Sequence, residues 1–220
     1  LLLVFSLLGV VMPDRLGVVI DAANSTVGIN VGWWYILLVT AFVFFAVWMA
    51  LSPWGAIRLG KDDTEPEFGL GSWFAMLFAA GMGIGLVFWG VAEPLNHYAA
   101  PPPGTQGDEP AVARQAMDIT YLHWGFHAWA IYVVVGLAMA YAVHRRGRPV
   151  SIRWALEPIL GKRTDTVWGD LIDVIAVVGT IFGVATSLGF GVSQIGAGLS
   201  FLGTIEEATN TVLVVLIVAI

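Results

Sequence analysis

The segment from Trp73 to Tyr98, WFAMLFAAGMGIGLVFWGVAEPLNHY, is apolar and long enough to cross a bilayer, yet it carries Gly81, Gly83 and Gly85 at its centre. A glycine inside a helix costs about 1 kcal/mol relative to alanine. Backbone that leaves the helix inside a membrane is tolerated only where it faces protein or a water-filled cavity. The spacing therefore predicts a span that is unwound or very closely packed at its middle, where free carbonyls and helix ends can bind ions or substrate.

A second interpretation fits the same glycines. Gly81 and Gly85 form a GxxxG pair, which is typical of closely packed membrane helices. A nucleotide-binding loop is excluded, because the spacing is GxGxG rather than GxGxxG and no strand precedes it. Helix packing and a functional break both remain open at this point.

The composition places the chain in a membrane. Hydrophobic residues make up 58% of the 220 residues and charged residues only 12%, well outside the range of soluble globular proteins. The absence of cysteine excludes disulfides, thiolate metal sites and a cysteine nucleophile. The formal net charge is -6 and the basic residues lie in loops rather than in one long tract, so nucleic acid is not expected as a partner.

The apolar runs predict an all-α integral membrane fold. The expected helices are a truncated one at Leu1–Met12, spans at Val31–Leu51, Trp73–Tyr98, Ile119–Val143 and Leu171–Gly191, and the start of a sixth at Thr211–Ile220. Pro13 ends the first helix, and a polar link through Asp21 and Asn24 leads to the second. Because the chain begins without Met inside one apolar run and stops inside another, we expect a fragment of a longer polypeptide.

The loops predict the orientation in the membrane. A charged loop at Ser52–Gly71 precedes the broken span, a polar loop follows Glu93 and Pro94, and a basic loop occupies His144–Gly169. The basic loop is expected to hold a short helix with Ser151 as its N-cap and Gly161 beyond its end. Lys and Arg number eight in residues 52–72 and 144–169, against two in the alternate segments. The positive-inside rule therefore predicts that both loops are cytoplasmic.

Three aromatic residues of the Ile119–Val143 span are candidates for binding a cation. On a regular helix Trp129 lies about 140° and Tyr132 about 80° around the axis from Trp124, over about 12 Å of rise. Aromatic faces bind a quaternary ammonium by cation–π attraction of about 0.5–2 kcal/mol per ring. Aromatic residues are also common in membrane spans without any ligand, and this alternative stays open.

Hydroxyl and carboxyl groups indicate fewer candidate binding sites than the aromatic residues do. A stripe of small and hydroxyl residues on the fifth span starts at Thr180 and ends at Gly191, which predicts a helix-packing seam or, alternatively, oxygen ligands for Na⁺. Asp118, Asp170 and Asp173 fall at span ends, where solvated carboxylates are expected. Glu93 stands just past the broken span, where one interpretation is an N-terminal charge for a following helix.

Long runs of the sequence resemble the betaine/carnitine/choline transporter family. They are SPWGAIRLGKDDTEPEFGLGSWFAMLFAAGMGIGLVFWGVAEPLNHY, HWGFHAWAIY and TIFGVATSLGFGVSQIGAGL, and the resemblance extends over essentially all of the chain. It implies twelve spans with a LeuT-like core of two inverted repeats, assembled as a homotrimer. Residues 1–71 would then hold the two peripheral helices, and residues 72–220 most of the first repeat.

The resemblance also implies the site residues. The aromatic cage of the family falls on Trp124, Trp129 and Tyr132, and its sodium site on the broken helix uses carbonyls that match Ala79 and Met82. The backbone of the break lies beside the substrate in this family, which adds the candidates Gly81, Met82, Gly83 and Gly85. Of two threonines at a second sodium site, one matches Thr180, but Val184 stands where the other would be.

The function that follows is sodium-coupled import of a trimethylammonium osmolyte, with glycine betaine preferred and no cofactor other than Na⁺ as coupling ion. Gly85 favours the zwitterion, because choline-type members tend to carry an acid at this position. The alternative is choline or carnitine transport with proton coupling or substrate exchange. The expected location is the cell (inner) membrane, as a multi-pass protein. A membrane-embedded enzyme or a channel would be the rival classes, and chemistry on the substrate is not expected.

Overall fold

The computed structural model describes residues 2–219, apart from the side chains of residues 2, 80 and 84, and all regular structure in this part is helical. The α-helices are α1 (Leu2–Val11), α2 (Pro13–Leu51), α3 (Leu70–Gly81), α4 (Ile84–Ala99), α5 (Glu109–Leu122), α6 (Ala128–Ala140), α7 (Glu157–Leu160), α8 (Val167–Phe201) and α9 (Asn210–Ala219). Short 3₁₀ turns occupy Pro53–Ala56, Ile152–Leu156 and Gly161–Asp165, and π-helical turns occupy His123–His127 and Tyr141–Arg145. The predicted all-α class is confirmed.

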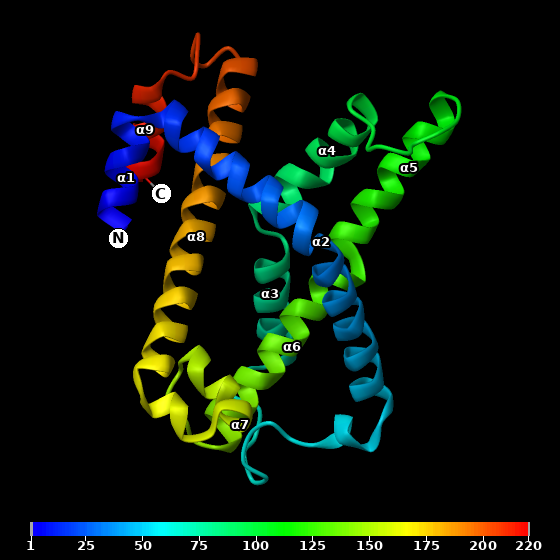
Figure 1. Cartoon of the computed structure of the whole chain (residues 1–220), viewed down its shortest axis with the longest axis vertical. Coiled ribbons are helices and arrows are strands. Elements are labelled where there is room, and N and C mark those ends of the chain that lie inside the picture. The colour runs from blue at the N-terminus through cyan, green and yellow to red at the C-terminus, as the bar shows by residue number, and fades with distance from the viewer. Residues whose placement is uncertain (1, 220) are drawn as a thin grey trace.

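Three continuous helical segments are long and apolar enough to cross a bilayer: Pro13–Leu51, Glu109–Arg145 and Val167–Phe201. The helices α3 and α4 follow one another across the predicted break (Figure 1). The polar link expected between Pro13 and Val31 is wrong, because α2 continues through it. Its polar side chains bond to the backbone of their own helix: Thr26 Oγ1 donates to the Ala22 carbonyl at 2.7 Å, and Asn30 Nδ2 donates to the Thr26 carbonyl at 2.7 Å.

The spans expected to start at Ile119 and Leu171 start earlier. Asp108 caps α5, since its side chain accepts a hydrogen bond from the Ala111 amide at 3.2 Å, so Asp118 lies inside a helix rather than at its end. Thr166 caps α8 in the same way by accepting from the Trp168 amide at 3.4 Å. These polar caps start the helices before the apolar run begins, which is why hydropathy alone placed the boundaries too late.

The break in the central span is confirmed. Met82 ends α3 with φ -93° and ψ 31°, and Gly83 precedes α4 with an extended conformation, φ -67° and ψ 178°. The polar loop expected beyond Pro94 begins after Ala99, because α4 continues through Pro94, and the predicted end of the span at Tyr98 is close to this point. Proline inside a helix removes one backbone donor, and membrane helices tolerate this where neighbouring groups satisfy the freed carbonyl.

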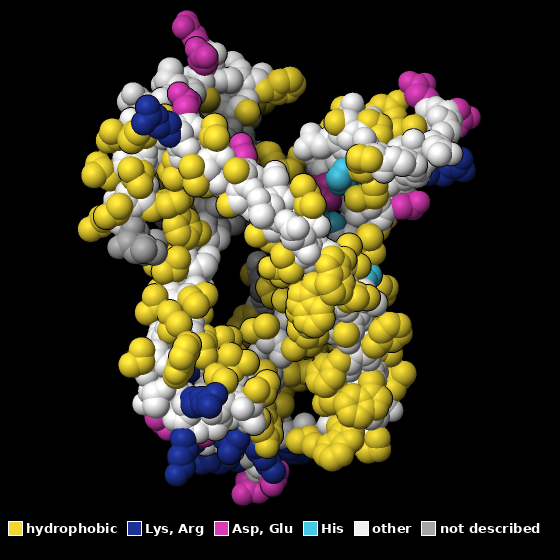
Figure 2. Space-filling model, viewed as in Figure 1, with side chains coloured by type: hydrophobic (Ala, Val, Ile, Leu, Met, Phe, Trp, Pro, Cys, Tyr) yellow, Lys and Arg dark blue, Asp and Glu magenta, His cyan; other side chains and the backbone are white. Residues whose placement is uncertain are grey.

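The surface separates by chemistry along the long axis. Hydrophobic side chains cover the middle of the face shown in Figure 2, and Lys and Arg gather at the end that carries α7. Both basic loops lie at this end, opposite the loop between α4 and α5 (Figure 1). A wide apolar band between two polar ends is what a bilayer requires of a protein surface, so the fold agrees with a chain that crosses the membrane several times.

Candidate substrate and ion site

The helix break brings two helix ends together. The last carbonyls of α3 have no partner within the helix, and those of Ala79 and Met82 belong to this turn. At the start of α4 the Gly83 carbonyl accepts from the amides of Leu86, at 3.1 Å, and Val87, at 3.2 Å. The first N–H groups of α4 and the last carbonyls of α3 thus flank the break at Met82 and Gly83. Such a pair of ends offers oxygen ligands for a hard cation and N–H donors for a carboxylate.

The two glycines at either side of the break lie directly beneath tryptophan rings. A Cβ added to Gly81 would lie 3.0 Å from Cη2 of Trp129, and one added to Gly85 would lie 3.2 Å from Cη2 of Trp124. A Cβ on Gly83 would meet nothing within 4 Å. Gly81 and Gly85 thus pack closely, as the GxxxG spacing predicts, but here against aromatic side chains. These two glycine–tryptophan contacts are compatible with both the packing interpretation and the functional interpretation of the glycines.

The aromatic residues do not lie on one regular helix. A π-helical turn at His123–His127 separates Trp124 from Trp129, and Gly125 within it leaves helical geometry with φ -86° and ψ -137°. The angles of 140° and 80° that a regular helix predicts around its axis therefore do not apply. The Gly within HWGFH was the signal for this kink, because π-turns occur where a side chain or function interrupts the helical ladder.

Trp129 and Tyr132 remain together beyond the π-turn. The rings of Trp129 and Tyr132 have centroids 5.6 Å apart at an interplanar angle of 42°. Exposure is 49% for Trp129 and 71% for Tyr132. Two of the three predicted aromatic residues therefore touch the glycines of the break, and the third extends the aromatic surface away from it. Trp129 and Tyr132 thus form one aromatic pair, and Trp124 pairs instead with the ring of His123.

Glu93 is the residue whose surroundings the sequence did not predict. It lies in the middle of α4 and not before a helix, and it is only 7% exposed. Its Oε2 accepts a hydrogen bond from Nε1 of Trp124 at 2.5 Å, and its Oε1 lies 2.8 Å from Nδ1 of His123. Nε2 of His97, one turn along α4, lies 3.5 Å from the same Oε1. The i, i+4 spacing of Glu93 and His97 could have indicated part of this cluster, but the contact with the π-turn could not be predicted from spacing.

Thr180 lies away from the helix break, in a groove of about 720 Å³ on α8. Its hydroxyl donates to the Ala176 carbonyl at 2.8 Å, which leaves the oxygen lone pairs able to accept or to bind a cation. The groove is lined by residues of the predicted stripe and by one cage residue: Tyr132, Thr180, Gly183, Val184, Ser187, Leu188, Gly191, Val192 and Ile195. Tyr132 thus connects the aromatic surface to the stripe of small and hydroxyl residues.

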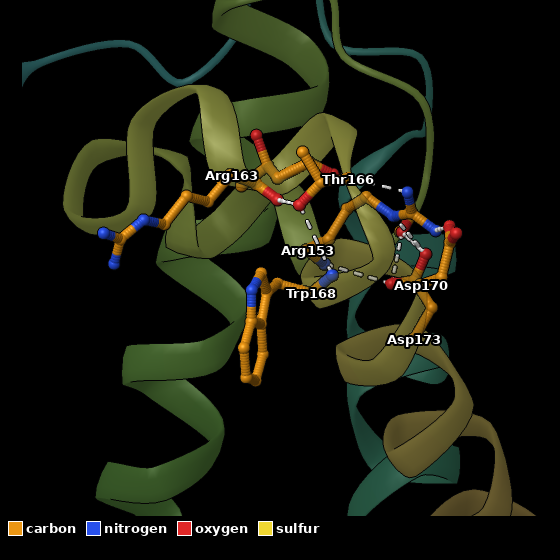
Figure 3. Close-up of polar contacts among 8 residues, drawn as sticks. Arg153, Arg163, Thr166, Trp168, Asp170 and Asp173 are labelled. Atoms are coloured by element: carbon orange, nitrogen blue, oxygen red, sulfur yellow. Dashed lines mark hydrogen bonds and ion pairs between the residues drawn. The ribbon is translucent and has the colours of Figure 1, made fainter.

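A polar cluster fixes the end of α8 that carries the basic loop (Figure 3). Arg153 donates from Nε to Asp173 at 2.5 Å and from Nη2 to Asp170 at 2.7 Å. Ser151 donates to both oxygens of Asp173 at 2.6 Å. The expectation of a solvated carboxylate is therefore wrong for Asp173, whereas Asp170 pairs with Arg153 and keeps its side chain 67% exposed. The predicted cap is also wrong, because the Ser151 hydroxyl serves Asp173 and not the short helix that follows.

Two further ion pairs hold the basic loops. Arg145, at the end of the π-turn Tyr141–Arg145, donates to Asp62 at 2.6 Å and so connects this turn to the Ser52–Gly71 loop. The same hydrogen bond lowers the pKa of the Asp62 carboxyl. Arg148 pairs with Glu157, and this hydrogen bond holds the pKa of the Glu157 carboxyl below its ordinary value. Asp62 and Arg145 are exposed, so their pair adds little stability by itself, whereas Arg148 and Glu157 are half-buried. The Arg145–Asp62 pair joins the two loops into one charged surface at the end of the molecule that carries α7.

Comparison with known proteins gives a family match over the whole chain. Residues 1–220 match the betaine/carnitine/choline family transporter. An uncharacterised transporter of Mycobacterium tuberculosis is 60% identical over 186 residues, which cover 83% of this chain and 31% of that protein. The glycine betaine transporter OpuD of Bacillus subtilis is 49% identical over 96% of this chain and 41% of its own length. The high-affinity choline transport protein of Escherichia coli is 44% identical over 94% of this chain and 31% of its own length. The chain therefore spans between about a third and two fifths of these relatives.

Proposed function

The chain belongs to the betaine/carnitine/choline transporter family, and from this premise we propose that the whole transporter imports a trimethylammonium osmolyte, glycine betaine before choline, together with Na⁺. Members of this family are multi-pass membrane transporters and not enzymes. Among its relatives are proteins named as glycine betaine transporters and one named as a choline transport protein. Osmoprotection would be the physiological result of such import.

The observation that carries the proposal is the contact between tryptophan rings and the broken helix. Trp124 and Trp129 rest on Gly85 and Gly81, on either side of the free backbone groups of the break. A quaternary ammonium has no N–H to donate, so aromatic faces are the groups that recognise it. The carboxylate of glycine betaine, which one methylene separates from the ammonium nitrogen, would accept hydrogen bonds from the N–H groups at the start of α4. The proposed site holds both ends of a zwitterion, with its open side closed by residues outside this chain.

Glycine at position 85 supports a zwitterion over choline. Choline is a bare cation, and a carboxylate near the site would offset the cost of burying its charge. Here a side chain at position 85 would collide with the ring of Trp124, whose Cζ3 lies 3.3 Å from a Cβ built there. An acid cannot be accommodated at that position without moving this ring. A choline-type site with an acid at position 85 would need a different arrangement of Trp124, whereas carnitine, itself a zwitterion, stays an alternative substrate.

The coupling ion is proposed to bind where α3 ends. Carbonyls of Ala79 and Met82 would supply oxygen ligands there, and the Thr180 hydroxyl would supply one to a second ion in the α8 groove. Val184 lines the same groove and offers no oxygen, so the site at the break is expected to dominate. The membrane potential alone contributes about 2.3 kcal/mol per charge per 100 mV to uptake. As in the family, the whole protein is proposed to act as a homotrimer.

The test is uptake by the full-length transporter in proteoliposomes. Radiolabelled glycine betaine should accumulate under an inward Na⁺ gradient, saturate, and be displaced by unlabelled betaine at lower concentration than by choline. Gly85→Asp should narrow or reverse that order. Uptake that persists when K⁺ replaces Na⁺ but stops on addition of a protonophore would contradict sodium coupling. A preference of the unmodified protein for choline would contradict the assignment of the substrate.

A further inference from the structure

We propose that Glu93 is a positioning residue of the substrate site, which holds the indole of Trp124 in place along α4 by accepting its N–H. The inference rests on the proposed function, because it gives Trp124 its role in the cage. Glu93 does not touch the substrate position in this account. It acts through the ring that does.

The indole of Trp124 is fixed at both ends by the same helix. Its Nε1 donates to Glu93 Oε2 at 2.5 Å, and its far edge, at Cη2 and Cζ3, lies against Gly85. Gly85 and Glu93 are eight residues apart, which is about 12 Å of rise along α4. The indole, the hydrogen bond and the Glu93 side chain together bridge these two turns of α4. The contact with Gly85 limits how closely the ring approaches α4, and the hydrogen bond to Glu93 limits how far the ring rotates.

The carboxylate of Glu93 is fully committed to this arrangement. A carboxylate this deeply buried is costly unless hydrogen bonds satisfy its oxygens, and both have partners here. Oε2 faces Trp124, whereas Oε1 faces His123 and, at longer range, His97. Each oxygen already has a close protein nitrogen as its partner, which leaves only one lone pair on each oxygen for any further ligand. The geometry therefore favours a structural anchor for Trp124 over an ion-binding role for Glu93.

One carboxylate of α4 reaches two consecutive residues at the start of the π-turn. Neighbours on a regular helix point about 100° apart. His123 and Trp124 stand at the start of the π-turn, with ring centroids 5.0 Å apart and planes inclined by only 38°, and both face Glu93. The start of the π-turn thus presents two ring nitrogens, Nδ1 of His123 and Nε1 of Trp124, to the Glu93 carboxylate of α4. The indole of Trp124 is therefore positioned by α4 and the π-turn together.

A double-mutant cycle in the full-length transporter tests the proposal. Glu93→Ala removes the acceptor, Trp124→Phe removes the N–H and keeps an aromatic ring, and the third variant combines them. Glu93→Ala is expected to raise KM for betaine uptake about tenfold, the effect of losing a hydrogen bond to a charged group, with little change in Vmax. In the Trp124→Phe background the same substitution should have much less effect, because the donor is already absent.

The matched control is Glu109→Ala. Glu109 also accepts a hydrogen bond from an aromatic residue of α4, the Tyr98 hydroxyl at 3.1 Å, but it is exposed and distant from Trp124. Its removal should leave KM unchanged. Should Glu93→Ala fail to fold, the isosteric Glu93→Gln takes its place in the cycle, with a smaller expected rise in KM because an amide oxygen is a weaker acceptor. Additive effects, or equal effects of the changes at Glu93 and Glu109, would overturn the proposal.

A spectroscopic measurement separates this inference from the proposed function. In protein labelled with 5-fluorotryptophan, the ¹⁹F signal that Trp124→Phe removes belongs to Trp124. Glu93→Gln should shift that signal, and Glu109→Gln should not. A shift together with unchanged KM for Trp124→Leu would support the anchor and contradict the substrate cage. A rise in KM for Trp124→Leu without any shift would support the cage and contradict the anchor.

Discussion

Gly85 controls how closely the ring of Trp124 approaches α4, so Gly85→Ala is a minimal perturbation of the proposed site. The new Cβ would lie 3.2 Å from Cη2 and 3.3 Å from Cζ3 of Trp124. Ordinary carbon–carbon contacts lie at about 3.5–4.0 Å, so the ring must move by at least about 0.3 Å. The ring cannot simply swing away, because Glu93 holds its opposite end.

The expected effect falls on substrate affinity more than on stability. Alanine is favoured over glycine in a helix by about 1 kcal/mol, which offsets part of the overpacking cost of about 1–3 kcal/mol. A displaced ring loses up to its whole cation–π contribution of about 0.5–2 kcal/mol. Complete loss corresponds to a rise in KM of about 2- to 30-fold. We expect Gly85→Ala to lie within this range with Vmax little changed.

Gly90→Ala on the same helix is the control. A Cβ at Gly90 would meet nothing within 4 Å, so this change adds helix propensity without touching a ring. Both variants are compared by betaine uptake kinetics and by thermal unfolding of the purified full-length transporter. Gly90→Ala should keep the KM of the unmodified protein and keep or raise its melting temperature. Equal KM values for Gly85→Ala and Gly90→Ala would refute the reasoning.

Two further predictions concern the charged end of the molecule. Cysteines introduced at Lys61 and Arg146 should both resist an impermeant thiol reagent in intact cells, since the two loops lie at one end and the positive-inside rule makes it cytoplasmic. Labelling of either from outside would contradict that orientation. Asp173→Asn should lower the melting temperature more than Asp63→Asn, because Asp173 faces Arg153 and is largely shielded whereas Asp63 is exposed. Equal melting temperatures would show that the cluster does not stabilise the end of α8.

The helix break could be predicted because its cause is local. Glycines spaced by two residues weaken any helix that contains them, whatever surrounds it, and the structure breaks at Met82 and Gly83 as expected. Helix ends were less predictable, because caps such as Asp108 and Thr166 act outside the apolar runs that hydropathy detects. The polar residues near Asn24 were wrongly predicted to form a link, because a helix can hold polar side chains by hydrogen-bonding them to its own backbone.

The contacts that build the site could not be predicted from spacing. The family resemblance identified Trp124 and Trp129 as cage residues, but no pattern within one segment shows that their rings rest on Gly85 and Gly81. The kink at Gly125 changed the angular relation that a regular helix predicts. The role of Glu93 depends on a second segment thirty residues away in sequence, and only the folded chain brings it to the indole.

The central claim is that the aromatic residues over the helix break bind the ammonium group, and direct binding tests it most simply. Radiolabelled glycine betaine should bind the purified full-length transporter in Na⁺, and Trp129→Leu should raise the Kd by about 2- to 30-fold, the loss of one cation–π contact. Trp48→Leu, which changes a tryptophan on α2 that is 54% exposed, should leave the Kd unchanged. Equal Kd values for the two variants would contradict the aromatic site.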